Sequence, residues 1–316
     1  CTKILFVTGL TLISCFVSFA DVCSDGIVVS IAKKEHTKGT IQSTVWVFRA
    51  FGALIGATFG GETYKRWGAV PVFHISSIVP LLLCVCIWRN KDEEFKPNAT
   101  PVLKNLIKNL REQKNLAITM FMISLAPDYG QFYSYFLKTE LGFDELDFTW
   151  LTVAASSTFL TATIFFHKCL LNESKSRVIL VGIAGATLFR LTQLLVVTKV
   201  LPLFSLVLLD TVAESFFDQL VLFPLIVLSA KAANEGNEAT FYALLMSISN
   251  FSNVVGDYFG AFVGSLFEID EQNYQYLPYF MAISILWGAI VPVVTILRME
   301  KKEKYNVVEP RELLST

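Results

Sequence analysis

The sequence predicts an all-α membrane protein, a polytopic bundle whose helices cross the bilayer many times. Two observations support this prediction. First, 53% of the 316 residues are hydrophobic and only 17% are charged, whereas about a quarter of the residues of a soluble protein are charged. Second, the apolar residues form long continuous runs, and a bilayer core of about 30 Å needs about 20 such residues in a helix. Transmembrane strands would show alternating apolar and polar residues instead.

Nine segments are long and apolar enough to be spanning helices. Backbone polar groups in lipid must be satisfied within their own segment unless a barrel closes, which favours helices here. Proline can kink or break such a helix, and Pro80, Pro127, Pro224 and Pro292 lie in or near these segments. The predicted spans are residues 4–32, 41–61, 69–88, 115–137, 148–166, 178–198, 202–230, 239–267 and 276–297.

The distribution of lysine and arginine predicts the orientation. Alternate connections of the predicted helices (33–40, 89–114, 167–177 and 231–238) and the tail from residue 298 carry 19 of the 26 basic residues. The connections on the opposite side carry 5. Because cytoplasmic loops are enriched in basic residues, we expect the first set to face the cytoplasm.

The longest connection divides the chain unequally. Residues 1–88 are predicted to be the last three helices of a first helical half, and 89–114 a cytoplasmic linker. Residues 115–298 are predicted to be a complete second half of six helices, followed by a cytoplasmic tail at 299–316. Many secondary transporters consist of two such halves, so we expect the first half to lack three helices. The linker contains an amphipathic helix, either interfacial or a solvated linker helix.

Ionisable residues interrupt the apolar segments. A charged residue at the centre of a spanning helix costs about 2.5 to 3.5 kcal/mol, so such residues usually line a polar cavity and mark a substrate or ion path. The alternative is that they form interhelical contacts that only hold the bundle together. We expect a shared cavity with substrate or proton contacts from Asp21, Asp25, Arg49, Arg190, Asp210, Glu214, Asp218 and Asp257; Asp128 is a further carboxylate in these segments.

The spacing of the carboxylates indicates proton coupling. Asp210, Glu214 and Asp218 are four residues apart and share one helix face, where like charges repel. Some of them must therefore be protonated, or paired with a cation or with Arg49 or Arg190. Glycines at the same spacing predict close helix packing rather than substrate contact: Gly52, Gly56 and Gly60 in the second segment, and Gly256 and Gly260 in the eighth.

Other classes of function receive no support from the sequence. The net charge of −1 argues against a nucleic-acid partner, which would require a basic face. There is no phosphate-binding loop, nucleophile elbow or HExxH motif, so no catalytic residue is assigned and an enzyme is not expected. The six cysteines show no metal spacing and are expected to be free thiols. We predict no metal and no cofactor.

Three stretches resemble the folate–biopterin transporters, a branch of the major facilitator superfamily. These are ADVCSDGIVV at 20–29, IQSTVWVFRAFGALIGATFGG at 41–61 and GNEATFYALLMSISN at 236–250. The resemblance implies a major-facilitator-like fold and alternating access to a site between two halves. It implies a folate or pterin substrate, with Asp21, Asp25 or Asp210 on the pterin edge and Arg49 or Arg190 on the substrate carboxylates.

The resemblance leaves several alternatives open. Relatives also carry S-adenosylmethionine, and the excess of buried acids suits a cationic substrate. A receptor that has the fold but does not transport is a second class. The expected partners are a small-molecule substrate, protons and membrane lipid, and the expected location is the plasma membrane or a plastid envelope.

Overall fold

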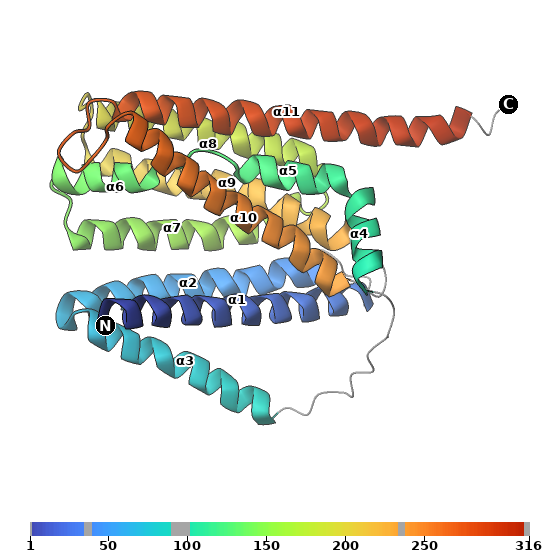
Figure 1. Ribbon diagram of the computed structural model, residues 1–316, viewed down its shortest axis with the longest axis horizontal. Coiled ribbons are helices and arrows are strands. Elements are labelled where there is room, and N and C mark those ends of the chain that lie inside the picture. The colour runs from blue at the N-terminus through green and yellow to red at the C-terminus, as the bar shows by residue number, and fades with distance from the viewer. Residues whose placement is uncertain (1, 35–39, 90–101, 233–237, 313–316) are drawn as a thin grey trace.

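The computed structural model describes residues 2–34, 40–89, 102–232 and 238–312 of the chain. Eleven α-helices and one π-helical turn account for nearly all of these described residues. Most of the helices run along a common direction, side by side in a bundle (Figure 1). Within the described ranges the only extended pairing is an isolated bridge between Asp270 and Asn273. The prediction of an all-α helix bundle is confirmed.

The helices follow the predicted segments in order. The first group is α1 (Thr2–Lys34), α2 (Thr40–Trp67), α3 (Ala69–Arg89) and the short α4 (Val102–Glu112). The second group is α5 (Lys114–Ser124), α6 (Gly130–Thr139), α7 (Glu145–Phe165) with the π-turn Phe166–Leu170, α8 (Lys175–Val197), α9 (Phe204–Ala232), α10 (Glu238–Leu266) and α11 (Leu277–Glu312). Residues 90–101 of the predicted linker and 313–316 of the predicted tail lie outside the described residues.

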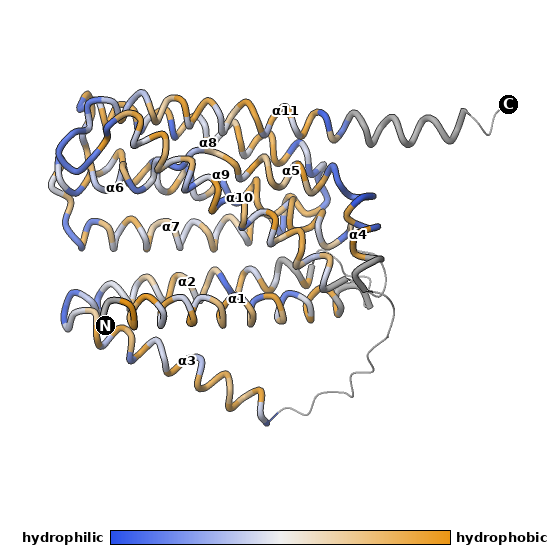
Figure 2. Tube along the Cα trace, in the orientation of Figure 1, coloured by the Kyte–Doolittle hydropathy of each residue, from blue (hydrophilic) through white to orange (hydrophobic). Residues whose placement is uncertain are grey.

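Seven helices in the described part of the chain are long and apolar enough to cross a membrane: α1, α2, α3, α7, α8, α9 and α11. Hydrophobic residues follow the helix shafts, and hydrophilic residues gather at the two ends of the bundle (Figure 2). The turns α2–α3, α6–α7 and α10–α11 lie at one end, whereas α4 and the end of α11 lie at the other (Figure 1). These connections therefore share an end of the bundle with others that were predicted to lie on the same side of the membrane; which end faces the cytoplasm remains a prediction.

The predicted span 115–137 is not a single helix. It is broken into α5 and α6 by the non-helical residues 125–129. Pro127 explains the break, since proline lacks the N–H of the helical ladder and disfavours helical conformation in the residue before it. Proline therefore interrupts this span, whereas α3 and α9 continue through Pro80 and Pro224.

The structure also shows how the predicted linker helix packs and where the last helix ends. The linker helix α4 places Leu106 and Leu110 against a core cluster formed by α5, α8, α9, α10 and α11, while Ile107 remains exposed. Its apolar face therefore packs partly on the bundle itself. Helix α11 continues to Glu312 rather than ending near 297, because the lysines and glutamates that follow are good helix formers.

The first three helices join the rest of the bundle mainly through two pairs of helices. Helix α2 packs along α7, and α1 crosses α10. The ring of Trp46 on α2 meets the edges of Phe159 and Phe223 at centroid distances of 6.2 and 5.9 Å. Val29 near the end of α1 is buried against α7, α9 and α10. The division of the chain into a partial and a complete half remains a prediction.

Candidate functional site

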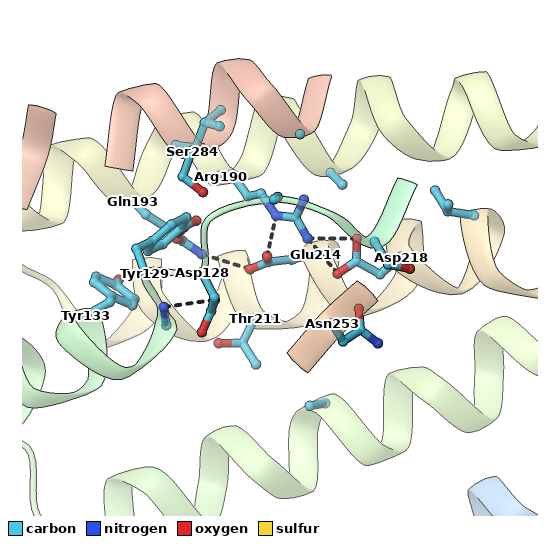
Figure 3. Close-up of a pocket in the computed structure, with 18 of the residues that line it drawn as sticks. Asp128, Tyr129, Tyr133, Arg190, Gln193, Thr211, Glu214, Asp218, Asn253 and Ser284 are labelled. Atoms are coloured by element: carbon cyan, nitrogen blue, oxygen red, sulfur yellow. Dashed lines mark hydrogen bonds and ion pairs between the residues drawn. The ribbon is translucent and has the colours of Figure 1, made fainter. Parts of the chain in front are cut away.

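A cavity of about 890 Å³ lies inside the second group of helices. Its walls come from α5, α6 and the break between them, and from α7, α8, α9, α10 and α11. Binding sites for small molecules typically measure about 300–1,000 Å³, so the space suits a metabolite of moderate size. Figure 3 shows polar side chains from several of these helices turned toward one another.

Arg190 on α8 is the centre of the strongest polar network in this cavity (Figure 3). Its Nε lies 2.6 Å from Oε1 of Glu214, and its Nη2 lies 3.0 and 2.9 Å from the two carboxylate oxygens of Asp218. Both carboxylates are on α9, one helical turn apart, so one guanidinium can bridge them. Charge-assisted contacts of this kind are about twice as strong as neutral hydrogen bonds.

The network continues from Glu214 toward α6. The side-chain amide of Gln193 donates to Oε2 of Glu214 at 2.8 Å, and the hydroxyl of Tyr129 donates to the amide oxygen of Gln193 at 2.8 Å. Gln193 and Tyr129 are both buried. The ion pair is therefore held in place by two further side chains from different elements.

Other residues that line the cavity carry polar groups that are not ion-paired within the described residues. Asp128, in the break after α5, accepts a hydrogen bond from the backbone N–H of Gly130 at 3.1 Å. Asn253 and Asp257 line the cavity from α10, and the hydroxyl of Ser249 on the same helix is hydrogen-bonded to that of Ser124 on α5 at 3.0 Å. These groups leave carboxylate and amide atoms facing the space.

The break itself is held by α10 and α11. Ser252 bonds to the carbonyl of Phe121, Ser284 to the carbonyl of Pro127, and the indole N–H of Trp287 to the carbonyl of Leu125. The backbone N–H of Asp128 donates to the carbonyl of Gly256 at 3.1 Å. Broken helices are tolerated at membrane depth when neighbouring helices satisfy the freed backbone groups, as they do here.

Glycines on α10 make this close approach possible. A Cβ atom added at Gly256 would lie 2.6 Å from the carbonyl oxygen of Ala126, and one at Gly260 would collide with the backbone of Asp128. By contrast, no heavy atom of the described residues lies within 4 Å of a Cβ added at Gly52, Gly56 or Gly60. That face of α2 is turned away from α7, which α2 meets at Gly61 and Thr149.

Asp210 lies on α9 one turn before Glu214, outside the residues that line the cavity. It is only 1% exposed, and its Oδ1 accepts a hydrogen bond from the hydroxyl of Thr192 on α8. Its other oxygen, Oδ2, has no hydrogen-bond partner in the described part of the chain.

Three of the predicted residues form a second, separate cluster between α1 and α2. Nη2 of Arg49 lies 3.1 Å from Asp21 and 2.9 Å from Asp25, with side-chain exposures of 60% and 15% for the two carboxylates. The guanidinium also lies over the ring of Trp46, 5.1 Å from its centroid. All three charged groups are thus engaged with one another.

The structure therefore gives two groups where the sequence analysis expected one cavity. Of the eight predicted residues, Arg190, Glu214, Asp218 and Asp257 line the cavity, Asp210 is buried beside it, and Asp21, Asp25 and Arg49 lie elsewhere. The reason is that each arginine pairs with acids on the helix next to it in the chain. Sequence analysis missed Tyr129, Tyr133, Gln193 and Asn253, although Gln193 shares a helix face with Arg190, and Asn253 with Asp257.

Comparison with known proteins gives the family. The family model described as the BT1 family matches residues 4–311. The chain belongs to the BT1 family. It is 26% identical over 295 residues to the folate-biopterin transporter of Synechocystis sp., a match that covers 88% of this chain and 60% of that protein.

Two further relatives, both from Plasmodium falciparum, are named as folate transporters. The chain is 24% identical over 311 residues to folate transporter 1, covering 92% of this chain and 60% of the relative. It is 23% identical over 279 residues to folate transporter 2, covering 85% of this chain and 61% of the relative. The chain thus spans about 60% of the length of these curated BT1 relatives. The resemblance to folate–biopterin transporters is confirmed, and the chain is an integral, multi-pass membrane protein.

Proposed function

We propose that the full-length protein is a secondary transporter, not an enzyme, that carries folates or pterins across a membrane. The observation that carries this proposal is a metabolite-sized cavity lined by a partly buried charge network in a BT1 chain whose relatives are named as folate or folate-biopterin transporters. A packing or receptor role alone does not explain why ionised groups surround an open space inside spanning helices, where they are costly.

The cavity offers groups that suit a pterin ring. The ring presents an amino group and a ring N–H on one edge, and one carboxylate can accept both. Asp21 and Asp25 are bonded to Arg49, and Asp210 is buried. Asp128 and Asp257 line the cavity without a cation among the described residues. We therefore assign the pterin edge to Asp128 or Asp257, in place of the three aspartates expected from sequence.

Arg190 is the group in this cavity that suits the carboxylates of a glutamate tail. Its Nε and Nη2 are engaged by Glu214 and Asp218, but its Nη1 makes no hydrogen bond within the described residues. An arginine presents five N–H donors in a fixed fork. A substrate carboxylate can therefore bind Nη1 while the two protein carboxylates keep the side chain in place.

Transport would proceed by alternating access. The first helices contact the second group through α2 with α7 and α1 with α10, and rocking across these contacts would expose the cavity to either side in turn. We further propose proton symport, since four carboxylates and one guanidinium among the cavity-lining residues leave a negative charge that an anionic folate must overcome. The membrane is proposed to be the plasma membrane or a plastid envelope.

The excess of carboxylates over guanidinium groups in the cavity also favours a second candidate substrate. A cationic metabolite such as S-adenosylmethionine would be attracted by the acidic lining without any protonation. Uptake of labelled folate, biopterin and S-adenosylmethionine into cells or proteoliposomes with the full-length protein, across an inward proton gradient, separates the two. Saturable uptake of folate or biopterin supports the proposal. Uptake of S-adenosylmethionine alone supports the second candidate and contradicts the first.

A matched set of variants tests the assigned residues. Each hydrogen bond to a charged group contributes about 1.5–3 kcal/mol, so Asp128→Asn or Asp257→Asn should weaken substrate affinity roughly 10- to 100-fold. The control is Glu62→Gln, because Glu62 pairs with Arg66 on the exposed surface of α2, outside the cavity. Unchanged affinity in both aspartate variants would contradict the assignment.

A further inference from the structure

Three side-chain oxygen atoms next to the cavity are buried without a hydrogen-bond partner in the described part of the chain: Oε1 of Gln219, Oδ2 of Asp210 and the hydroxyl of Tyr133. The last two belong to ionisable residues. The two residues are 1% and 9% exposed. Buried polar groups without a hydrogen-bond partner are rare in native structures. A proton or a water molecule can supply the missing hydrogen bond.

The two groups come from different helices. Tyr133 lies on α6 and lines the cavity, whereas Asp210 lies on α9 and does not line it. Tyr133 belongs to the same buried cluster as Val207, which lies one turn before Asp210 on α9, and the charge of Asp210 acts on Tyr133. The other ionisable group that acts on Asp210 in the described residues is Glu214, one turn along α9. From α8, Asp210 meets the hydroxyl of Thr192.

Charge pairing distinguishes Asp210 from its neighbours. Arg190 bonds to Glu214 and Asp218, so these two carboxylates are compensated while ionised. Within the described residues, Asp210 has no salt-bridge partner. Burying an ionised carboxylate without a cation costs several kcal/mol, whereas a protonated carboxyl group needs only hydrogen bonds.

We propose that Asp210 binds the proton that drives transport, with Tyr133 as its partner on the cavity side. This inference rests on the proposed function. One proton adds to Oδ2 of Asp210, and the new O–H donates to one water molecule, which donates in turn to the hydroxyl oxygen of Tyr133. After the proton leaves, the Tyr133 O–H donates to this water molecule, which donates to the ionised Oδ2. Either state satisfies both oxygens.

The arrangement also separates the proton from the substrate while keeping the two coupled. Asp210 does not line the cavity, but Tyr133 does. A substrate in the cavity therefore reaches Tyr133 and not Asp210. A bound substrate covers Tyr133 and closes this route to Asp210, so the substrate and the proton are released in a fixed order.

Infrared difference spectroscopy of the purified full-length protein tests proton binding without any transport measurement. The band of a protonated carboxyl group should change with pH in the wild type and in Glu62→Gln. It should be absent in Asp210→Asn and shifted in Tyr133→Phe, which removes only the hydroxyl. A band that persists unchanged in Asp210→Asn would overturn the proposal.

Transport assays in proteoliposomes test the coupling. Asp210→Asn imitates the protonated state, so it should still exchange internal for external substrate but no longer accumulate it on a proton gradient. Retained gradient-driven accumulation would overturn the proposal. If the wild type transports no folate or pterin, the proposed function fails, and the infrared band still decides whether Asp210 binds a proton.

Discussion

The guanidinium of Arg190 bridges Glu214 and Asp218, with Nε 2.6 Å from Oε1 of Glu214 and Nη2 2.9 Å from Oδ2 of Asp218. This bridge joins α8 to two successive turns of α9 at the wall of the cavity. The guanidinium compensates the charges of two carboxylates that would otherwise repel each other, and it holds both side chains in place. We therefore expect the stability of the bundle and the chemistry of the cavity to depend on the same three side chains.

Replacing Arg190 should impair both properties. Arg190→Gln leaves Glu214 and Asp218 facing each other without a cation, and lost hydrogen bonds to charged groups cost about 1.5–3 kcal/mol each. We expect a lower unfolding temperature in detergent and loss of uptake. The double variant Arg190→Gln with Asp218→Asn should recover part of the thermal stability but not the uptake. A single variant with wild-type unfolding temperature would contradict this role.

The glycines of α10 and α2 should respond differently to the same change. Gly260→Ala forces a methyl group against the backbone of Asp128, and overpacking typically costs about 1–3 kcal/mol. Gly56→Ala meets no heavy atom of the described residues within 4 Å, and alanine is favoured over glycine in a helix by roughly 1 kcal/mol. Thermal unfolding should show a loss for Gly260→Ala only. Equal losses would show that α2 packs as closely as α10.

One hydrogen bond that holds the break after α5 can be tested by removing its donor. Trp287→Phe keeps an aromatic six-membered ring but removes the part of the indole whose N–H donates to the carbonyl of Leu125. Leaving a buried carbonyl unsatisfied costs about 1–3 kcal/mol, so the variant should be less stable and bind substrate more weakly. Trp150→Phe is the control, because Trp150 on α7 is 57% exposed. Equal unfolding temperatures of the two variants would contradict a stabilising role for this hydrogen bond.

The two aspartates that bond to Arg49 should differ in importance. The Asp25 side chain is 15% exposed and lies 2.9 Å from the guanidinium, whereas the Asp21 side chain is 60% exposed and lies 3.1 Å away. Asp25→Asn should therefore lower the unfolding temperature of the full-length protein more than Asp21→Asn. The reverse order would show that Asp21, not Asp25, holds Arg49.

Much of the fold can be predicted from the chain alone, because lipid imposes simple rules. Long apolar runs must be helical in a bilayer, and the basic residues near their ends set the orientation. The sequence indicated a break at Pro127 in part, since a proline can kink or break a spanning helix. What could not be foreseen is that Pro80 and Pro224 leave their helices continuous, because neighbouring contacts decide that outcome.

The sequence predicted which charged residues form part of the candidate site, but it did not predict how they are arranged. The cost of burying charge singled out Arg190, Glu214 and Asp218, and their helical spacing put the two acids on one face. Asp257 was found by the same argument. Tyr133 and Gln193 carry no comparable signal, because tyrosine and glutamine are common in helices that face neither substrate nor ions.

The sequence by itself determined that this BT1 chain is a bundle of spanning helices with costly ionised groups inside it, since hydropathy and helical period act along one segment at a time. Only the tertiary structure decided which charges meet. Arg49 pairs with α1 and Arg190 with α9, while Asp210 is left with a buried, unpartnered oxygen among the described residues. Such pairings depend on how each helix is rotated against its neighbours, and that rotation is set by packing between segments far apart in the chain.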